Sequence, residues 1–392
     1  MNEAIQHEPS TDVVVTTVAG QVTPTQYAAS PEYNDMVLSL LRQSARSGNA
    51  ESQAKLGAMY ACGDGVPRNH TIARQFLRRA ADKGHATALY NLGVLHAQGY
   101  GVDVNPEMAF ECYSKAAKLG SLDALNNLGV CYQNGFGCVR NLHLAFEKFR
   151  EAAERGYAVA MSNCGYMKEL GLGSNLDEEE AIRFYRSAAG RGCVEAAYNL
   201  GRLHIFTKTI YDDFDLGREW LHKAARMGSG DAFNLLGCIE YKGLKVTRDY
   251  EKARQFFLQA ERFGNAAAKN NLAWLYQHGY GVPRDLEKAM HYYTESAALG
   301  YSSAQCNLGY LYYHGLGVDK NLPKACELFR RAVEAENVTA MFNLALLHLD
   351  PDSGYRDDAR AAFLLKKCAL EGFAEARDLL EQIRARDASG RA

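Results

Sequence analysis

The stretch AQCNLGYLYYHGLGVDKNLPKACELFRRA, residues 304–332, contains two helical patterns separated by a turn. In its first half, small and apolar residues stand three and four positions apart, which is the spacing of one helix face. Gly315 and Gly317 follow, and glycine readily adopts the left-handed conformation that ends helices. In the second half, Ala325 precedes Phe329 by four residues, again one helix face. The stretch therefore predicts a helix, a tight turn and a second helix.

This pattern recurs nine times with a period of 36 residues and no insertion or deletion. If Gly309 is position zero, leucine stands at position −1 in eight repeats and alanine at −5 in eight. A glycine inside a helix costs up to about 1 kcal/mol relative to alanine, so its recurrence at position zero predicts a close helix contact. Position zero is occupied by Gly57, Gly93, Gly129, Gly165, Gly201, Gly237, Ala273, Gly309 and Ala345.

The turn after the first helix reads Gly-x-Gly in six repeats, which superficially resembles a phosphate-binding loop. A phosphate loop follows a strand and occurs once, whereas this turn follows a helix and recurs, so it predicts a helix end. Repeat five departs from the pattern. It has Thr207-Lys208-Thr209 instead, followed by Asp212, Asp213 and Asp215. These acidic residues suggest a solvated turn, with an acidic patch or a metal site as the alternative.

A repeat of this length predicts an all-α fold, a right-handed αα solenoid of nine helix-turn-helix repeats with half-repeat caps. The domain boundaries follow from the register. We expect a lone cap helix over 32–48, repeats over 49–372 and a second cap helix over 373–386. Residues 1–31 lack a helical period and are rich in Thr, Gln and Pro, so they predict a disordered tail. Residues 387–392 form a short second tail.

Composition excludes several classes of function. The net charge is −2, and nucleic-acid binding normally needs a clear basic excess. No apolar run reaches the roughly 18 residues of a membrane span, so we expect no membrane insertion. The ten cysteines occupy ten different repeat positions and form no Cys-x-x-Cys pair. A disulfide ladder or a zinc site would recur at one spacing, so free thiols and a cytoplasmic location are expected.

The consensus Ala-x-x-Asn-Leu-Gly-x-x-Tyr-x-x-Gly-x-Gly closely resembles the Sel-one-like repeat (SLR) family, relatives of the tetratricopeptide repeats. The resemblance covers roughly residues 32–386. It implies a non-catalytic adaptor or scaffold that binds another protein, or an extended peptide segment, in a concave groove lined by the first helix of each repeat. It implies no cofactor. The secreted, cysteine-rich members place cysteines at recurring positions, and this chain does not.

Candidate partner-binding residues lie at positions −2, +1, +4 and +5 of the first helix. Position −2 is asparagine in seven repeats, and an amide both donates and accepts, so it could pair with a peptide backbone. The alternative is that each amide ties its repeat to the neighbouring backbone. Position +1 varies and includes residues typical of interface hot spots. The candidates are Asn91, Asn127, Asn163, Tyr166, Asn199, Arg202, Asn271, Trp274, His278, Asn307, Tyr310, Tyr313, His314 and Asn343.

Two other functions stay open at this point. An inhibitor or immunity protein that sequesters a toxin or enzyme would have the same sequence features as an adaptor. Weak hydrolase or penicillin-binding activity is implied by some secreted relatives, although the chain contains no Gly-x-Ser-x-Gly, His-Glu-x-x-His or Walker A motif. His278 and His314 share position +5 of adjacent repeats but have no third metal ligand in register, so we expect no metal site. The sequence does not fix an oligomeric state.

Overall fold

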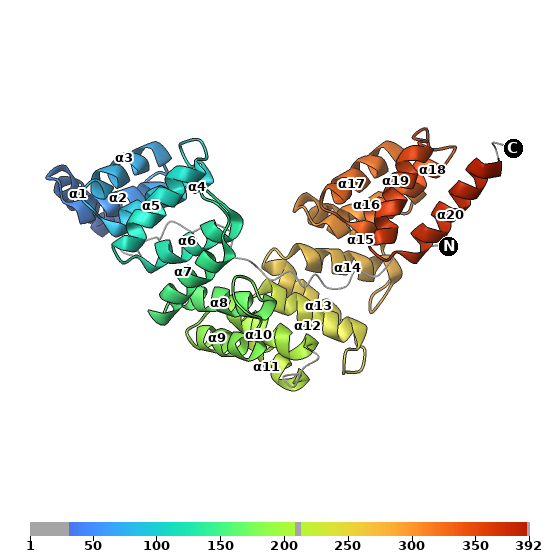
Figure 1. Ribbon diagram of the computed structural model, residues 1–392, viewed down its shortest axis with the longest axis horizontal. Helices are drawn as coiled ribbons and strands as arrows, with labels where there is room; N and C mark the ends of the chain where they lie inside the picture. The colour runs from blue at the N-terminus through green and yellow to red at the C-terminus, as the bar shows by residue number, and fades with distance from the viewer. Residues whose placement is uncertain (1–30, 208–212, 390–392) are drawn as a thin grey trace. The chain divides into compact units, whose positions relative to one another are not determined.

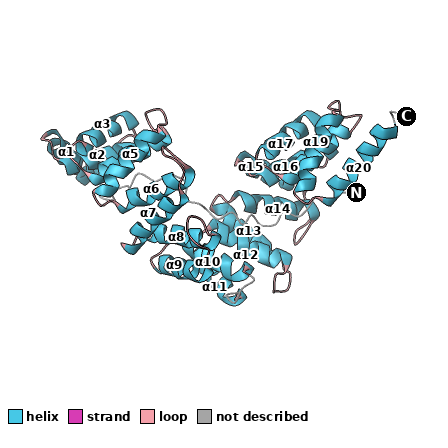
Figure 2. Ribbon diagram, in the orientation of Figure 1, coloured by secondary structure: helices cyan, strands magenta, loops and turns pink. Residues whose placement is uncertain are grey.

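The computed structural model describes residues 31–207 and 213–389. Residues 1–30 of the tail predicted to be disordered lie outside the described residues, whereas Pro31 begins a helix. Lys208, Thr209 and Asp212 of the atypical turn in repeat five also lie outside. Within the described ranges, the chain forms twenty helices joined by short loops, and no strand occurs (Figure 2). The predicted all-α solenoid of paired helices is confirmed. None of these helices is both long and apolar enough to cross a membrane.

Each repeat contributes a first helix, here called A, and a second helix, called B (Figure 1). The A helices are α2 (Ala50–Cys62), α4 (Ala86–Gln98), α6 (Leu122–Asn134), α8 (Ala158–Leu170), α10 (Val194–Phe206), α12 (Gly230–Lys242), α14 (Ala266–His278), α16 (Ser302–His314) and α18 (Val338–Leu349). The B helices are α3 (His70–Ala81), α5 (Pro106–Lys118), α7 (Leu142–Glu154), α9 (Glu178–Gly190), α11 (Phe214–Arg226), α13 (Tyr250–Arg262), α15 (Leu286–Ala298), α17 (Leu322–Glu334) and α19 (Asp358–Leu370). Unpaired helices precede and follow them: α1 (Pro31–Arg46) and α20 (Ala374–Ser389).

The described residues divide into two compact units, and the boundary falls inside α10, between residues 200 and 201. Within each unit, consecutive helices pack against one another. A helices of adjacent repeats also touch, as α2 and α4 do in the first unit and α14 and α16 do in the second. The A helices therefore form a continuous layer within each unit, and this layer carries the candidate binding residues.

Local sequence signals set the ends of the helices. Glycine follows seven of the nine A helices and is left-handed at each, as at Gly279, where φ is 73° and the N–H bonds to the carbonyl of Leu275. Thr207 follows α10 and Asp350 follows α18 instead. B helices begin at an asparagine or aspartate whose side chain accepts the N–H three residues on, as Asn141 does from Leu144. These caps satisfy backbone groups that the helix leaves unpaired. The 36-residue register thus carries its own helix start and stop signals.

The recurring glycine at position zero lies against the large side chain of the B helix in the same repeat. A Cβ atom added to Gly129 would lie 2.5 Å from Cε1 of Phe149, and the Phe149 ring is completely buried. Gly237 and Phe257 repeat the same contact at 2.5 Å. The glycine expected to serve packing therefore does so at Gly129 and Gly237, because a Cβ at either position would overlap the ring; repeat seven has Ala273 at position zero and still buries Tyr293.

We expect Gly129→Ala to destabilise the protein although alanine favours helix. Overpacking costs about 1–3 kcal/mol and the propensity gain is about 1 kcal/mol, so the free energy of unfolding should fall by up to about 2 kcal/mol. Gly190 on α9 is the matched control because nothing lies within 4 Å of its hypothetical Cβ. Gly190→Ala should be neutral or stabilising. Urea unfolding midpoints measure both, and equal stabilisation by the two variants would contradict the contact.

All ten cysteines are free thiols in the structure. Eight are buried, Cys138 is partly exposed and Cys62 is exposed. Burial raises the pKa of the Cys112 thiol to about 11 and that of Cys131 to about 12, so these groups stay protonated near neutral pH. The thiols act as small apolar side chains inside the repeats.

Titration of the denatured protein without reductant should therefore return close to ten thiols. In the native protein only Cys62 and Cys138 should react rapidly with a disulfide reagent, because the other eight are buried. A denatured count of about six or fewer would show that disulfides form, and it would argue against a reducing compartment.

Candidate functional site

The asparagines at position −2 form side-chain hydrogen bonds between repeats. Nδ2 of Asn163 donates to Oδ1 of Asn126 at 2.9 Å, and the same bond joins Asn271 to Asn234 at 3.0 Å. Each pair links position −2 of one repeat to position −3 of the preceding repeat, 37 residues earlier. The amides thus tie neighbouring A helices together, through a side chain of the preceding repeat rather than through the backbone.

The residue at position −3 decides whether this link forms. Asn307 donates to Asn270 at 2.9 Å, and Asn343 donates to the sulfur of Cys306 at 3.4 Å. Asn91 has Ala54 at the corresponding place, and its buried amide has no hydrogen-bond partner among the described residues. Sequence reasoning missed position −3, because it is not constant along the chain.

Several predicted site residues are buried by this packing. Those under 9% exposed offer little surface to a partner; they are Asn91, Asn127, Asn199, Arg202 and Asn307. Tyr166, at position +1 of repeat four, is half-buried. The physical reason is that positions −2 and +1 face the neighbouring A helix rather than open solvent.

One pocket of about 340 Å³ brings predicted residues together with others that the sequence did not indicate. Asn271 and Trp274 come from α14, and Asn307 comes from α16. The remaining lining residues come from α12, α13, α14 and the turns after α12 and α14. They are Cys238, Tyr241, Lys242, Arg248, Tyr250, Phe257, Asn270 and Tyr280. The pocket therefore lies within the second unit, where repeats six, seven and eight adjoin.

Aromatic rings cluster along this pocket. The indole N–H of Trp274 donates to the hydroxyl of Tyr241 at 2.8 Å. Tyr250 and Tyr280 stack with their centroids 4.9 Å apart and their planes 12° from parallel. His278 stacks on Tyr280 at 5.6 Å and lies 3.9 Å from the Trp274 ring. These contacts hold the rings in fixed orientations, so the pocket has rigid apolar walls.

Two cations, Lys242 and Arg248, accompany the rings, and neither forms an ion pair with a described residue. Arg248 stands eleven residues after position zero, and in two other repeats the arginine at this position bonds to the end of the A helix. Arg140 and Arg284, at that position, each donate Nε to a carbonyl near the end of the A helix, at 2.9 and 3.1 Å. Arg248 instead donates to the hydroxyl of Tyr250, at 3.2 Å. Its guanidinium is thus held at the pocket.

The pocket thiol is not poised for chemistry. Burial raises the pKa of Cys238 to about 12, and Lys242 lowers it by less. A thiol with that pKa remains protonated near neutral pH and is a poor nucleophile. The described residues also contain no group of three or more metal-ligating side chains. The features that this pocket offers are shape, aromatic surface, amides and positive charge, which suit binding.

The predicted residues of repeat eight form a second aromatic cluster. The ring of His314 lies 4.3 Å from that of Tyr310 and 4.8 Å from that of Tyr313. The Tyr313 hydroxyl donates to Oδ2 of Asp350 at 3.3 Å, which places this tyrosine between repeats eight and nine. Of this repeat, only Asn307 lines the pocket of repeat seven.

Sequence reasoning missed the contribution of the turns. Tyr280 lies inside a Gly-x-Gly turn, Arg248 lies in the segment that leads to α13, and Tyr250 is the first residue of α13. Lys242 stands at position +5, the position of His278 and His314. A count of aromatic and basic residues in the turns of repeats six and seven would have indicated this neighbourhood.

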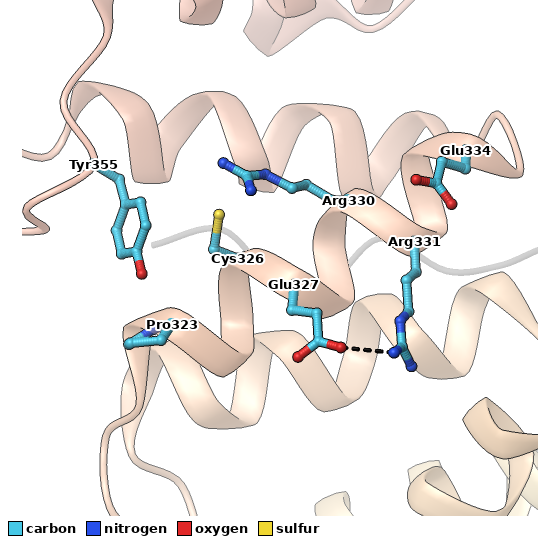
Figure 3. Close-up of a pocket in the computed structure, with 7 residues that line it drawn as sticks. All are labelled: Pro323, Cys326, Glu327, Arg330, Arg331, Glu334 and Tyr355. Carbon is cyan, nitrogen blue, oxygen red and sulfur yellow. Dashed lines mark ion pairs between the residues drawn. The ribbon is translucent and has the colours of Figure 1, made fainter.

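A second pocket lies beside α17 and the loop before α19 (Figure 3). It is lined mostly by charged side chains, and Arg331 pairs with Glu327 at 2.6 Å. Cys326 is its deepest group, and burial raises the pKa of that thiol. No residue predicted from the sequence lines it. We therefore place the candidate site in the aromatic pocket.

The inter-repeat amide bond can be tested in the first unit, away from the pocket. Asn126→Ala and Asn163→Ala should each lower the free energy of unfolding by about 1 kcal/mol, because each loses a buried hydrogen bond. The double variant should lose less free energy of unfolding than the sum of the two single losses, because both single changes remove the same hydrogen bond. A double-mutant cycle by urea unfolding should give a coupling of about 0.5–1.5 kcal/mol, and additive effects would show that the bond contributes nothing.

Comparisons with known proteins agree with the repeat register. The Sel1 repeat model matches residues 50–85, 86–121, 122–157, 158–193, 194–229, 231–262, 266–301, 302–337 and 338–373. Among curated proteins, none matches this chain.

Solved structures share the architecture. One is a protective antigen of uropathogenic Escherichia coli strains that displays an SLR fold, with 30% identity, coverage of 88% of this chain and 82% of that one, and a TM-score of 0.55. Another is a Sel1 repeat protein from Oxalobacter formigenes, with 27% identity, coverage of 84% and 97%, and a TM-score of 0.57. With nine matched repeats along most of its length, the chain belongs to the Sel1 repeat family.

Proposed function

We propose that this protein is a non-catalytic interaction scaffold or adaptor, and that the aromatic pocket of repeats six to eight receives an extended segment of a partner protein. Sel1 repeats mediate protein–protein interactions. The observation that carries the proposal is the meeting of Asn271, Trp274 and Asn307 in one pocket. Amides can pair with a peptide backbone, and tryptophan is enriched at the energetic centres of interfaces.

The spacing of the helices suits an extended chain. Packed helices lie roughly 8–10 Å apart, and an extended residue spans about 3.3–3.6 Å. Two or three residues of the partner therefore bridge one repeat, so a segment that meets Asn271 on α14 can also reach Asn307 on α16. Asn307 is only 6% exposed and already donates to Asn270, so half-buried Asn271 is the amide more open to a ligand.

The penicillin-binding alternative draws little support from the structure. A Ser-x-x-Lys sequence, the pattern of that enzyme class, occurs on α2 from Ser52 to Lys55. Ser52 is 9% exposed, and its hydroxyl lies 2.8 Å from that of Ser44 on α1. This serine occupies the small-residue position −5, where it packs between helices.

The proposed surface can be tested in the source cells by photo-crosslinking. A photoreactive residue in place of Tyr280, at the pocket, should capture a discrete partner. The same residue in place of Phe363, exposed on α19, serves as the control. Capture from the Phe363 position alone would place the interaction on another face of the protein.

Trp274→Ala should weaken binding of the captured partner by on the order of 2 kcal/mol. The thermal unfolding midpoint should change little, because Trp274 is half-buried and lines a pocket. Calorimetric titration measures the affinity, and Phe363→Ala is the matched aromatic control. In a Trp220→Phe background, the fluorescence of Trp274 alone should shift when the partner binds. An unchanged affinity, or a large fall in thermal stability, would show that Trp274 packs within the fold and does not bind the partner.

A further inference from the structure

We propose that the partner segment carries an internal aspartate or glutamate next to an aromatic residue, and that this pair occupies the pocket between α12, α14 and α16. This inference rests on the proposed function, because it names the chemistry of the segment that the pocket would receive. It follows from the charge, the rings and the extent of the pocket.

The charge of the pocket is positive and unbalanced. Lys242 and Arg248 line it, and no acidic side chain does. The two nearest carboxylates in sequence have other roles: buried Glu240 lies 3.5 Å from Arg218, and Asp249 caps α13 by accepting the N–H of Lys252. Two cations beside low-polarity walls attract an anion more strongly than cations in open water do. A carboxylate on the partner therefore complements this pocket.

The rings favour an aromatic neighbour for that carboxylate. Trp274, Tyr241 and Tyr280 form walls that a flat side chain can stack against, and aromatic pairs add stabilisation beyond the area that they bury. Such walls can also hold a cationic ligand. The unpaired charges of Lys242 and Arg248 disfavour that ligand here, so the electrostatics select an acidic segment over a basic one.

The extent of the pocket favours an internal residue over a chain terminus. Its lining comes from three successive A helices, α12, α14 and α16, and α16 in turn packs against α18. A segment that places a carboxylate near Lys242 and continues toward Asn307 crosses two further repeats, so the pocket takes several consecutive residues of the partner, and we take the carboxylate to be a side chain among them. Asparagine amides at successive repeats suit a main chain that runs past them.

Two peptide-display libraries provide the test, both selected against the full-length protein. One presents random twelve-residue segments with fixed sequence on both sides, and the other ends in a free carboxylate. Selection should enrich Asp or Glu beside Trp, Tyr or Phe in the internal library. Enrichment confined to the free-terminus library would overturn the inference, because it would assign the cations to a terminal carboxylate.

Charge reversal gives the decisive comparison. Lys242→Glu with Arg248→Glu should weaken the selected peptides at least about tenfold, and selection on this variant should enrich Lys or Arg at the same place. Lys366→Glu on α19 is the matched control, because Lys366 is exposed and does not line the pocket. Circular dichroism should show that both variants keep the helical fold, which is expected for exposed and half-buried positions. Affinities unchanged by the double reversal would overturn the inference.

The outcomes separate this inference from the proposed function. Peptides that lose binding with Trp274→Ala but show no acidic preference would support segment binding in the pocket and overturn the acidic segment. Peptides that bind equally well to Trp274→Ala would reject the pocket itself. Raising the salt concentration should weaken the acidic peptides, because screening reduces attraction between partly exposed charges.

Discussion

The contact between a glycine of the A helix and a large side chain of the B helix sets the geometry of every other layer. Because Gly129 has no Cβ, the ring of Phe149 lies directly on the helix backbone, and the same contact recurs between Gly237 and Phe257. Ring and backbone could not approach in this way around a larger residue. Seven of the nine repeats have glycine at position zero, and the other two have alanine, the next smallest residue, so a small residue recurs there with the strict 36-residue period.

The interface between repeats has a recurring contact as well. The amide bonds from position −2 to position −3 join A helices where both residues are asparagine, as between Asn307 and Asn270. Where position −3 is Ala54, the amide of Asn91 is buried without a described partner. A single substitution at position −3 thus decides between the bond of Asn307 and the amide of Asn91 without a described partner. Contacts between neighbouring repeats of this kind contribute to the stability of repeat proteins.

The candidate pocket develops from local departures within this regular frame. Trp274 stands at position +1, where most repeats have a smaller residue. Arg248 donates to the hydroxyl of Tyr250, whereas Arg140 at the same repeat position donates to a helix carbonyl. The start of α13 adds Tyr250, and the turn after α14 adds Tyr280, which stacks on it. Repeat six keeps the contact between Gly237 and Phe257, repeat seven has Ala273 at position zero, and both repeats keep their helix caps. The pocket combines rigid rings with two cations that no described carboxylate neutralises.

The sequence by itself determined the helices, their pairing and the number of repeats, because caps, glycines and apolar spacing are local signals that recur. It also indicated Asn271, Trp274 and Asn307 as candidates. Only the tertiary structure decided that Asn91 and Asn199 are buried, and that Arg248 and Tyr280 lie beside Trp274. These facts depend on how one repeat rests on the next. That arrangement follows from side chains 33 to 37 residues apart, and a pattern read within one repeat does not contain it.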